Sequence, residues 1–234
     1  MPDLHILQSR YMQILETIDD TETFLFFAYG TNLLEKIIRM ENKTAMFISI
    51  GRLDNYRLDF IRFNQFWNGP TFTIVPTANA HVWGAIYNLH KSDIISLDNQ
   101  KGVDIKKYYQ KDMIINTPFM GNFECRVYEQ RRNALPRGDN DVIPLNQWPS
   151  KTYMEVIIEG AIQRGLPEYY INMLKNIKHN GQEGCLKMEE LLKRYIVPPT
   201  CKCWWTYRYN RKPLVLDVTK INFTKNKINK KGKN

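Results

Sequence analysis

The order of strand-like and helical segments constrains the fold of this chain more than any other feature of its sequence. Runs rich in β-branched and aromatic residues come first, at residues 45–50, 56–63, 71–76, 82–89, 109–117 and 123–129. Helical patterns follow at residues 150–164, 168–178 and 186–195. Segregated strands and helices indicate an α+β fold rather than an alternating α/β fold. With the run at residues 24–28, about seven short strands can form a small closed or strongly curled mixed β-barrel flanked by helices.

Length and charge divide the 234 residues into three parts. Residues 1–23 carry apolar side chains on one helical face, which predicts a short amphipathic helix that docks on the domain. Residues 24–195 form the predicted domain. Residues 196–234 contain ten Lys or Arg residues and one Asp, and so account for the whole net charge of +9. We expect the Lys-rich end of this basic extension to be disordered.

Several functional classes are excluded at this stage. No window approaches the ~18 apolar residues that a membrane span requires, so we expect no transmembrane segment. The first residues lack the basic region and apolar core of a secretory signal, and four scattered cysteines do not suggest a disulfide framework. These features predict a cytoplasmic protein. Cys201 and Cys203 have no second Cys or His pair at ligand spacing, so we predict no metal site and no cofactor.

The segment FLFFAYGTNLL, residues 24–34, runs from a strand into a tight polar turn. Two interpretations are open for this turn. A Gly-containing turn between a strand and a helix can present backbone N–H groups to an anion, with Thr31 and Asn32 adding polar side chains. The alternative is an ordinary strand–turn–helix corner in which Thr31 or Asn32 caps the helix.

The turn does not stand alone. It is followed by W-x-G-x-x-x-T-I at residues 67–74, VWGAIY at 82–87, SLDNQKGV at 96–103 and a helix at 153–167 that ends in RGLP. Together, in this order and spacing, the five motifs resemble the γ-glutamylcyclotransferase family over residues 24–195. In that family the first motif is usually YGSN, so Thr31 stands where serine is usual.

The resemblance implies a barrel with one pocket at its mouth and a small-molecule partner, a γ-glutamyl amino acid or peptide. Family members cyclise this substrate to 5-oxoproline and release a free amino acid, because the α-amine attacks the γ-amide carbonyl. Members are often dimers, so the resemblance also implies that two copies of this chain can pair. The implied substrate-binding residues are Phe26, Phe27, Ala28, Tyr29, Gly30, Thr31, Asn32, Tyr108, Tyr128 and Tyr153.

One position departs from the family pattern. The catalytic acid/base of the family is a glutamate directly before Gly-Val, and here that position holds Lys101. A lysine ammonium repels the substrate's α-ammonium and offers no lone pair. Three interpretations are open: Lys101 is desolvated enough to act as a neutral base, a neighbouring carboxylate takes over, or turnover is lost and the pocket binds without cyclising. The candidate carboxylates are Asp98, Asp104 and Glu124.

The basic extension has its own two interpretations. Residues 204–212, WWTYRYNRK, interleave aromatic and basic side chains, which can stack on nucleotides or contact an acidic surface. Alternatively the aromatic side chains dock on the barrel while the basic ones stay in solvent. We expect at most a weak anionic partner for this extension.

Overall fold

The computed structural model describes residues 21–132, 134 and 143–192. Residues 1–20 of the amphipathic helix predicted at residues 1–23, the basic extension and the proposed domain end at residue 195 lie outside the described residues.

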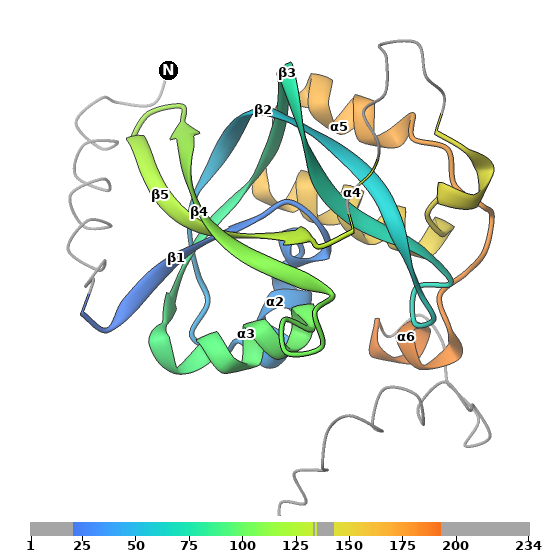
Figure 1. Cartoon of the computed structure of the whole chain (residues 1–234), viewed down its shortest axis with the longest axis horizontal. Helices are drawn as coiled ribbons and strands as arrows, with labels where there is room; N and C mark the ends of the chain where they lie inside the picture. Colours follow the sequence, from blue (N-terminus) through green and yellow to red (C-terminus); the bar gives the residue numbers. More distant parts are fainter. Residues whose placement is uncertain (1–20, 133, 135–142, 193–234) are drawn as a thin grey trace, which may run out of the picture.

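The described residues form a closed five-stranded barrel with helices on its outside (Figure 1). Its strand order is β1-β3-β2-β4-β5, and it is mixed because β1 runs antiparallel to β3 but parallel to β5. The predicted α+β barrel is therefore confirmed. The strands are β1 Thr23–Ala28, β2 Met46–Asn64, β3 Gly69–His90, β4 Tyr108–Thr117 and β5 Gly121–Gln130.

The expected number of strands is wrong, because β2 and β3 each contain two of the predicted runs. β2 joins the runs at 45–50 and 56–63, and β3 joins those at 71–76 and 82–89. The two strands pair over most of their length, with register shifts that include one between Asp54 and Tyr56. Asn55 lies in that shift with φ of 62°. A bulge bends a strand without ending it, which allows two long strands to follow the curved wall of a barrel.

The barrel consists of two parts that meet at two narrow junctions. β1, β3 and β2 form one sheet, and β4 and β5 form an antiparallel hairpin of ten residue pairs. In the described part of the chain, one pair, Phe26 with Arg126, joins β1 to β5, and one pair, Arg52 with Asn116, joins β2 to β4.

The helices cover the outside of the barrel and hold the segment after β1. Helix α4 packs against the short 3₁₀ helix η1, which follows β1 directly. A Cβ atom on Gly160 of α4 would lie 2.5 Å from the backbone nitrogen of Leu34, so only glycine permits this approach. The helices are η1 Thr31–Leu33, α2 Glu35–Glu41, η2 Lys91–Asp93, α3 Ile94–Lys101, η3 Leu145–Gln147, α4 Lys151–Arg164, α5 Glu168–Lys175 and α6 Leu186–Leu191.

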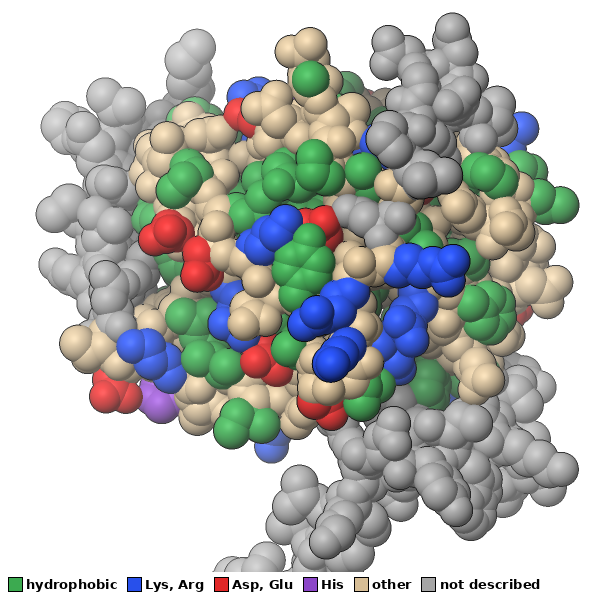
Figure 2. All heavy atoms as spheres, in the orientation of Figure 1, with side chains coloured by type: hydrophobic (Ala, Val, Ile, Leu, Met, Phe, Trp, Pro, Cys, Tyr) green, Lys and Arg blue, Asp and Glu red, His purple; other side chains and the backbone are tan. Residues whose placement is uncertain are grey.

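The hydrophobic core is aromatic and aliphatic, with Phe26, Phe27, Phe60 and Tyr128 among its fully buried side chains. On the face shown in Figure 2, charged and apolar side chains are interspersed, and several Lys and Arg side chains gather near the middle. No helix in the described part of the chain is long and apolar enough to cross a membrane.

Candidate functional site

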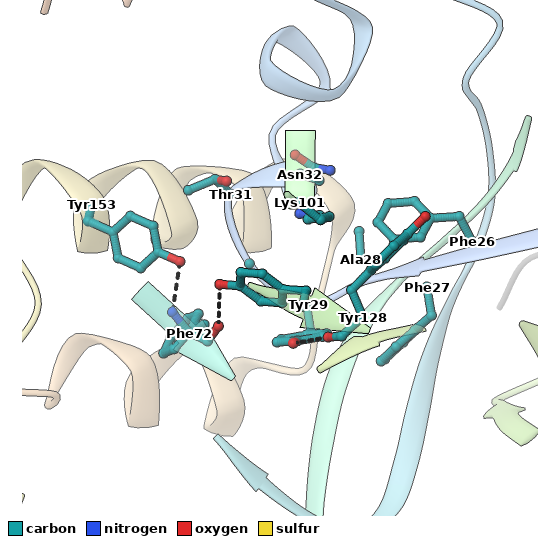
Figure 3. Close-up of a pocket in the computed structure, with 12 residues that line it drawn as sticks. Phe26, Phe27, Ala28, Tyr29, Thr31, Asn32, Phe72, Lys101, Tyr128 and Tyr153 are labelled. Carbon is teal, nitrogen blue, oxygen red and sulfur yellow. Dashed lines mark hydrogen bonds between the residues drawn. The ribbon is translucent and has the colours of Figure 1, made fainter. Parts of the chain in front are cut away.

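A pocket lies where β1 ends and turns into η1 (Figure 3). Its free space is about 40 Å³. The structure brings together in its wall the ten implied substrate-binding residues and Lys101, and it adds Phe72 of β3. The pocket is lined by Phe26, Phe27, Ala28, Tyr29, Gly30, Thr31, Asn32, Phe72, Lys101, Tyr108, Tyr128 and Tyr153.

The turn at residues 29–32 is held by side-chain contacts rather than by a helix cap. Neither η1 nor α2 has a side-chain cap, so the expected capping by Thr31 or Asn32 is wrong. The buried Asn32 instead donates its Nδ2–H to Oε1 of Gln100 at 3.1 Å, which ties the turn to α3. A Cβ atom on Gly30 would lie 3.8 Å from the Tyr153 hydroxyl, so a side chain at this position would take up space in the pocket.

Three of the four pocket tyrosines donate their hydroxyl protons within the protein. Tyr29 donates to the carbonyl oxygen of Tyr128 at 2.5 Å, and Tyr108 donates to the carbonyl oxygen of Phe72 at 3.2 Å. Tyr128 donates to Oδ1 of Asp98 at 2.5 Å. These three hydroxyl groups therefore fix the wall of the pocket.

Tyr153 differs from the other three. Its hydroxyl oxygen accepts a hydrogen bond from the backbone N–H of Phe72 at 3.0 Å (Figure 3). Within the described part of the chain, no acceptor receives the Tyr153 hydroxyl proton. The proton of this hydroxyl is therefore available to a ligand.

Burial keeps the pocket phenols in their neutral form. Loss of solvation raises the pKa of Tyr29 and Tyr153 well above the usual value, and nearby phenol groups raise both further. Burial likewise raises the pKa of Tyr108, although hydrogen bonds with Thr71 and Gln130 oppose the shift. At neutral pH these groups act as hydrogen-bond donors and acceptors without charge.

Lys101 brings an amino group to the pocket from the end of α3. The helix stops at Gly102, whose left-handed conformation with φ of 67° suits glycine. The Lys101 Nζ atom lies 6.0 Å from the centre of the Phe26 ring. The residue is half-buried, whereas a neutral lysine base requires deep burial. The structure thus gives little support to the neutral-base interpretation.

One of the three candidate carboxylates reaches the wall of the pocket. Asp98, one helical turn before Lys101, pairs with Arg126 Nη2 at 2.7 Å and accepts the Tyr128 hydroxyl proton. Arg126 Nε also donates to the Tyr128 hydroxyl oxygen at 2.7 Å. Asp104 and Glu124 are exposed and do not line the pocket.

Comparison with known proteins identifies relatives of this chain. The AIG2-like family model matches residues 81–174. The gamma-glutamylcyclotransferase of Mus musculus is 35% identical over 180 residues, which cover 74% of this chain and 89% of the mouse protein. The gamma-glutamylcyclotransferase of Homo sapiens is 33% identical over 182 residues, which cover 75% of this chain and 90% of the human protein. The chain belongs to the γ-glutamylcyclotransferase family.

The fold of the family is preserved as well. A solved structure of a gamma-glutamyl cyclotransferase is 31% identical, with a TM-score of 0.65, and the match covers 74% of this chain and 99% of that chain. The region matched by the AIG2-like model contains Lys101 and three of the pocket tyrosines but not the turn at residues 29–32.

Two features of this γ-glutamylcyclotransferase-family pocket were not identified from the sequence. Phe72 lies inside a predicted strand, where an aromatic residue suggests core rather than site. The bonds from Asp98 to Arg126 and Tyr128 link α3 with β5, and no short-range pattern indicates such a contact. Among the described residues, no group of three or more His, Cys, Asp and Glu side chains is arranged to hold a metal ion.

Proposed function

We propose that this member of the γ-glutamylcyclotransferase family binds a small γ-glutamyl-type compound in the pocket and has lost most of the family's cyclisation activity. One observation carries the proposal. None of the twelve described residues that line the pocket is Asp or Glu, and Lys101 supplies the one basic side chain.

The chemistry of cyclisation explains why this matters. The substrate's α-ammonium must lose a proton before its nitrogen attacks the γ-carbonyl carbon, and a proton must reach the leaving nitrogen as the amide C–N bond breaks. A positioned carboxylate can accept the first proton and deliver the second. Lys101 as an ammonium can accept none, and it repels the group that has to lose the proton. A missing general base commonly costs ~10²–10⁴ in rate.

The pocket keeps features that suit binding. The hydroxyl proton of Tyr153 is available to an acceptor oxygen of a ligand. The aromatic residues Phe26 and Phe72 in the wall suit the methylene groups of a γ-glutamyl chain.

A direct assay tests the proposal. The wild-type chain, Lys101→Glu and the surface control Lys106→Glu are incubated with γ-glutamylalanine, and 5-oxoproline is measured by mass spectrometry. We expect little product from the wild type and from Lys106→Glu. We expect Lys101→Glu to be faster by at least ~100-fold, because it restores a carboxylate at the pocket. Rapid turnover by the wild type would contradict the proposal. A fall in that turnover in Lys101→Gln would then assign the activity to Lys101.

A second candidate, residual cyclisation supported by Asp98, rests on the 2.5 Å contact between Asp98 Oδ1 and the Tyr128 hydroxyl. In this route the α-ammonium passes a proton to the Tyr128 oxygen as Tyr128 passes its own proton to Asp98. Burial and the bond to Asp98 raise the pKa of Tyr128, and Arg126 stabilises the Asp98 carboxylate. We therefore favour binding. If the wild type forms 5-oxoproline slowly, Asp98→Asn tests the route through Tyr128 and Asp98. Product formation should stop in this variant if Asp98 accepts the proton, and should continue unchanged if it does not.

We also propose a cytoplasmic location, pairing of two copies of the chain and a weak anionic partner for the basic extension. A cytoplasmic setting is consistent with the free thiols of Cys125 and Cys185. Pairing of two copies is tested by sedimentation velocity. A weak anionic partner of residues 196–234 is supported by their ten basic residues.

A further inference from the structure

Four basic residues from three separate segments meet at one end of the barrel. Arg62 lies near the end of β2, Lys107 directly precedes β4, and Arg131 and Arg132 directly follow β5. The three arginines are exposed and Lys107 is half-buried. We call these four residues the basic cluster.

Backbone hydrogen bonds hold the cluster together. The backbone N–H of Arg62 donates to Oε1 of the buried Gln130, the last residue of β5, at 3.1 Å. The backbone N–H of Arg131 donates to the carbonyl oxygen of Lys107, also at 3.1 Å. The cluster therefore belongs to the frame of the barrel, although its segments are distant along the chain.

The charges of the cluster repel one another. Burial lowers the pKa of Lys107 and the nearby Arg62 guanidinium lowers it further, while Asp104 opposes the shift less strongly. In the part of the chain that the structure describes, none of the four side chains forms an ion pair with a carboxylate. An anionic partner relieves such repulsion, so the fold maintains an arrangement that this partner stabilises.

Exposed apolar side chains lie beside the cluster. Phe63 directly follows Arg62 and is 61% exposed, two residues before the connection between β2 and β3. Ile105 is 43% exposed and lies in a turn that the Lys107 N–H closes by donating to the Gly102 carbonyl oxygen at 2.9 Å. Basic residues attract anionic headgroups, and apolar side chains near them gain by entering the lipid interface.

We infer that this end of the barrel docks on an anionic membrane surface. The basic cluster contacts the lipid headgroups, and Phe63 and Ile105 enter the interface. Single-stranded nucleic acid is attracted by the same charges, but its bases stack on aromatic rings and gain little from an aliphatic side chain such as Ile105. The pairing of charge with both apolar side chains therefore favours lipid. This docking surface is separate from the basic extension at residues 196–234.

Vesicle binding tests the role of the charges. The full chain is sedimented with phosphatidylcholine vesicles with and without phosphatidylserine, and the bound fraction gives a partition coefficient. We expect binding that requires phosphatidylserine. We expect the partition coefficient to fall at least about tenfold in a triple variant, because each basic residue near an anionic surface contributes to attraction. The triple variant combines Arg62→Gln, Lys107→Gln and Arg131→Gln.

A matched control removes the same three charges from exposed positions outside the cluster. It combines Lys36→Gln, Lys43→Gln and Lys175→Gln. The basic extension is present in both triple variants, so its contribution to binding stays constant. We expect the partition coefficient of the control to fall by less than about threefold. An equal fall in both triple variants, or no fall in either, would overturn the inference.

Phe63→Ser tests the apolar contribution. We expect it to lower the partition coefficient at least about threefold, because an aromatic side chain leaves the interface. Phe119→Ser is the control, since Phe119 is 87% exposed in the turn between β4 and β5, at the other end of that hairpin. It should leave vesicle binding unchanged.

Two further outcomes would also overturn the inference. One is equal binding to vesicles with and without phosphatidylserine. The other is an unchanged partition coefficient in Phe63→Ser together with salt-sensitive binding of single-stranded RNA that the cluster variant loses, which would assign the cluster to nucleic acid. Circular dichroism checks that each variant is folded. If the triple variant is not, Arg131→Gln and Arg132→Gln, both at exposed positions, are measured singly, and each should lower the partition coefficient about threefold. Unchanged partition in both single variants would contradict the inference.

Discussion

The hydroxyl group of Tyr153 joins the wall of the pocket to the barrel. It satisfies the backbone N–H of Phe72, a residue that is 2% exposed. Tyr153→Phe leaves that N–H without its partner, and an unsatisfied buried donor costs about 1–3 kcal/mol. We expect the free energy of unfolding, measured by urea denaturation, to fall by this amount, and ligand affinity to fall with it.

Tyr56→Phe is the matched control, because Tyr56 is only partly buried and lies outside the pocket. We expect it to change the free energy of unfolding by less than about 0.5 kcal/mol. If Tyr153→Phe is as mild as this control, the bond to Phe72 does not contribute as described.

The thiol of Cys125 makes stability depend on pH in the alkaline range. Burial in β5, with help from Asp112 and Glu124, raises the pKa of the Cys125 thiol to about 12. In the unfolded chain a thiol ionises near ~8.5. Above the unfolded pKa, the unfolded chain therefore releases a proton that the folded protein keeps. The contribution of Cys125 to the free energy of unfolding is complete below the unfolded pKa and is lost as pH rises through the folded pKa. The expected loss from this residue is about 1.4 kcal/mol per pH unit above ~9.

Urea denaturation of the wild type and Cys125→Ala between pH 8 and pH 10 measures this slope. Cys125→Ala should be less stable at pH 8, because it leaves a cavity, but should lose stability less steeply as pH rises. Cys185→Ala, at a half-buried position, should keep the wild-type slope. Equal slopes in all three proteins would contradict the assignment to Cys125.

At the scale of elements, the close contact of α4 with η1 determines where the turn after β1 lies. A Cβ atom on Gly160 would approach the backbone of Leu33 and Leu34 within 2.7 Å. Gly160→Ala must therefore separate α4 from η1. Overpacking of this kind typically costs about 1–3 kcal/mol. We expect a matching fall in unfolding free energy by urea denaturation, together with weaker ligand binding, because the turn lines the pocket.

Glu159→Ala, at an exposed position of the same helix, is the control for helix propensity and should change stability by less than about 0.5 kcal/mol. The prediction for Gly160 is wrong if Gly160→Ala is stabilising, as it would be at an uncrowded helical position.

The sequence predicted the type of most elements but not the length of the strands. Asn55 lies between two β-like runs and suggests a turn, because asparagine tolerates positive φ. In the structure the same residue lies in a bulge within β2. Only the pairing with β3 distinguishes a bulge from a turn, and that pairing joins residues distant along the chain.

For the candidate site, the sequence indicated the lining residues but not their hydrogen bonds. The turn and Lys101 stand in recognisable motifs, and the resemblance supplied the tyrosines. The bonds of those tyrosines were not predictable, because Tyr29 reaches a carbonyl oxygen 99 residues away. The sequence therefore predicts which residues line the pocket but not which hydroxyl proton remains available.

For the whole molecule, the distribution of charge separates the domain from its extension. Residues 1–195 contain equal numbers of acidic and basic residues, so residues 196–234 account for the net charge of +9. We expect a chain that ends at residue 195 to elute from a cation exchanger at much lower salt and to keep its affinity for γ-glutamylalanine.

Salt-sensitive binding to DNA, RNA or anionic vesicles is the companion measurement for this truncation. Binding that persists without residues 196–234 would show that the extension does not carry the anionic partner. The Lys and Arg side chains gathered on the face in Figure 2 would then be the place to look.

The two narrow junctions of the barrel bear on how the molecule opens. Phe26 forms one of them with Arg126, and the same residue lines the pocket together with Tyr128 of the opposite strand. A ligand in the pocket thus contacts both sides of a seam that has few backbone hydrogen bonds of its own. Local opening should begin at this seam, and a bound ligand should slow amide hydrogen exchange in β1 and β5 more than in the long β2–β3 ribbon.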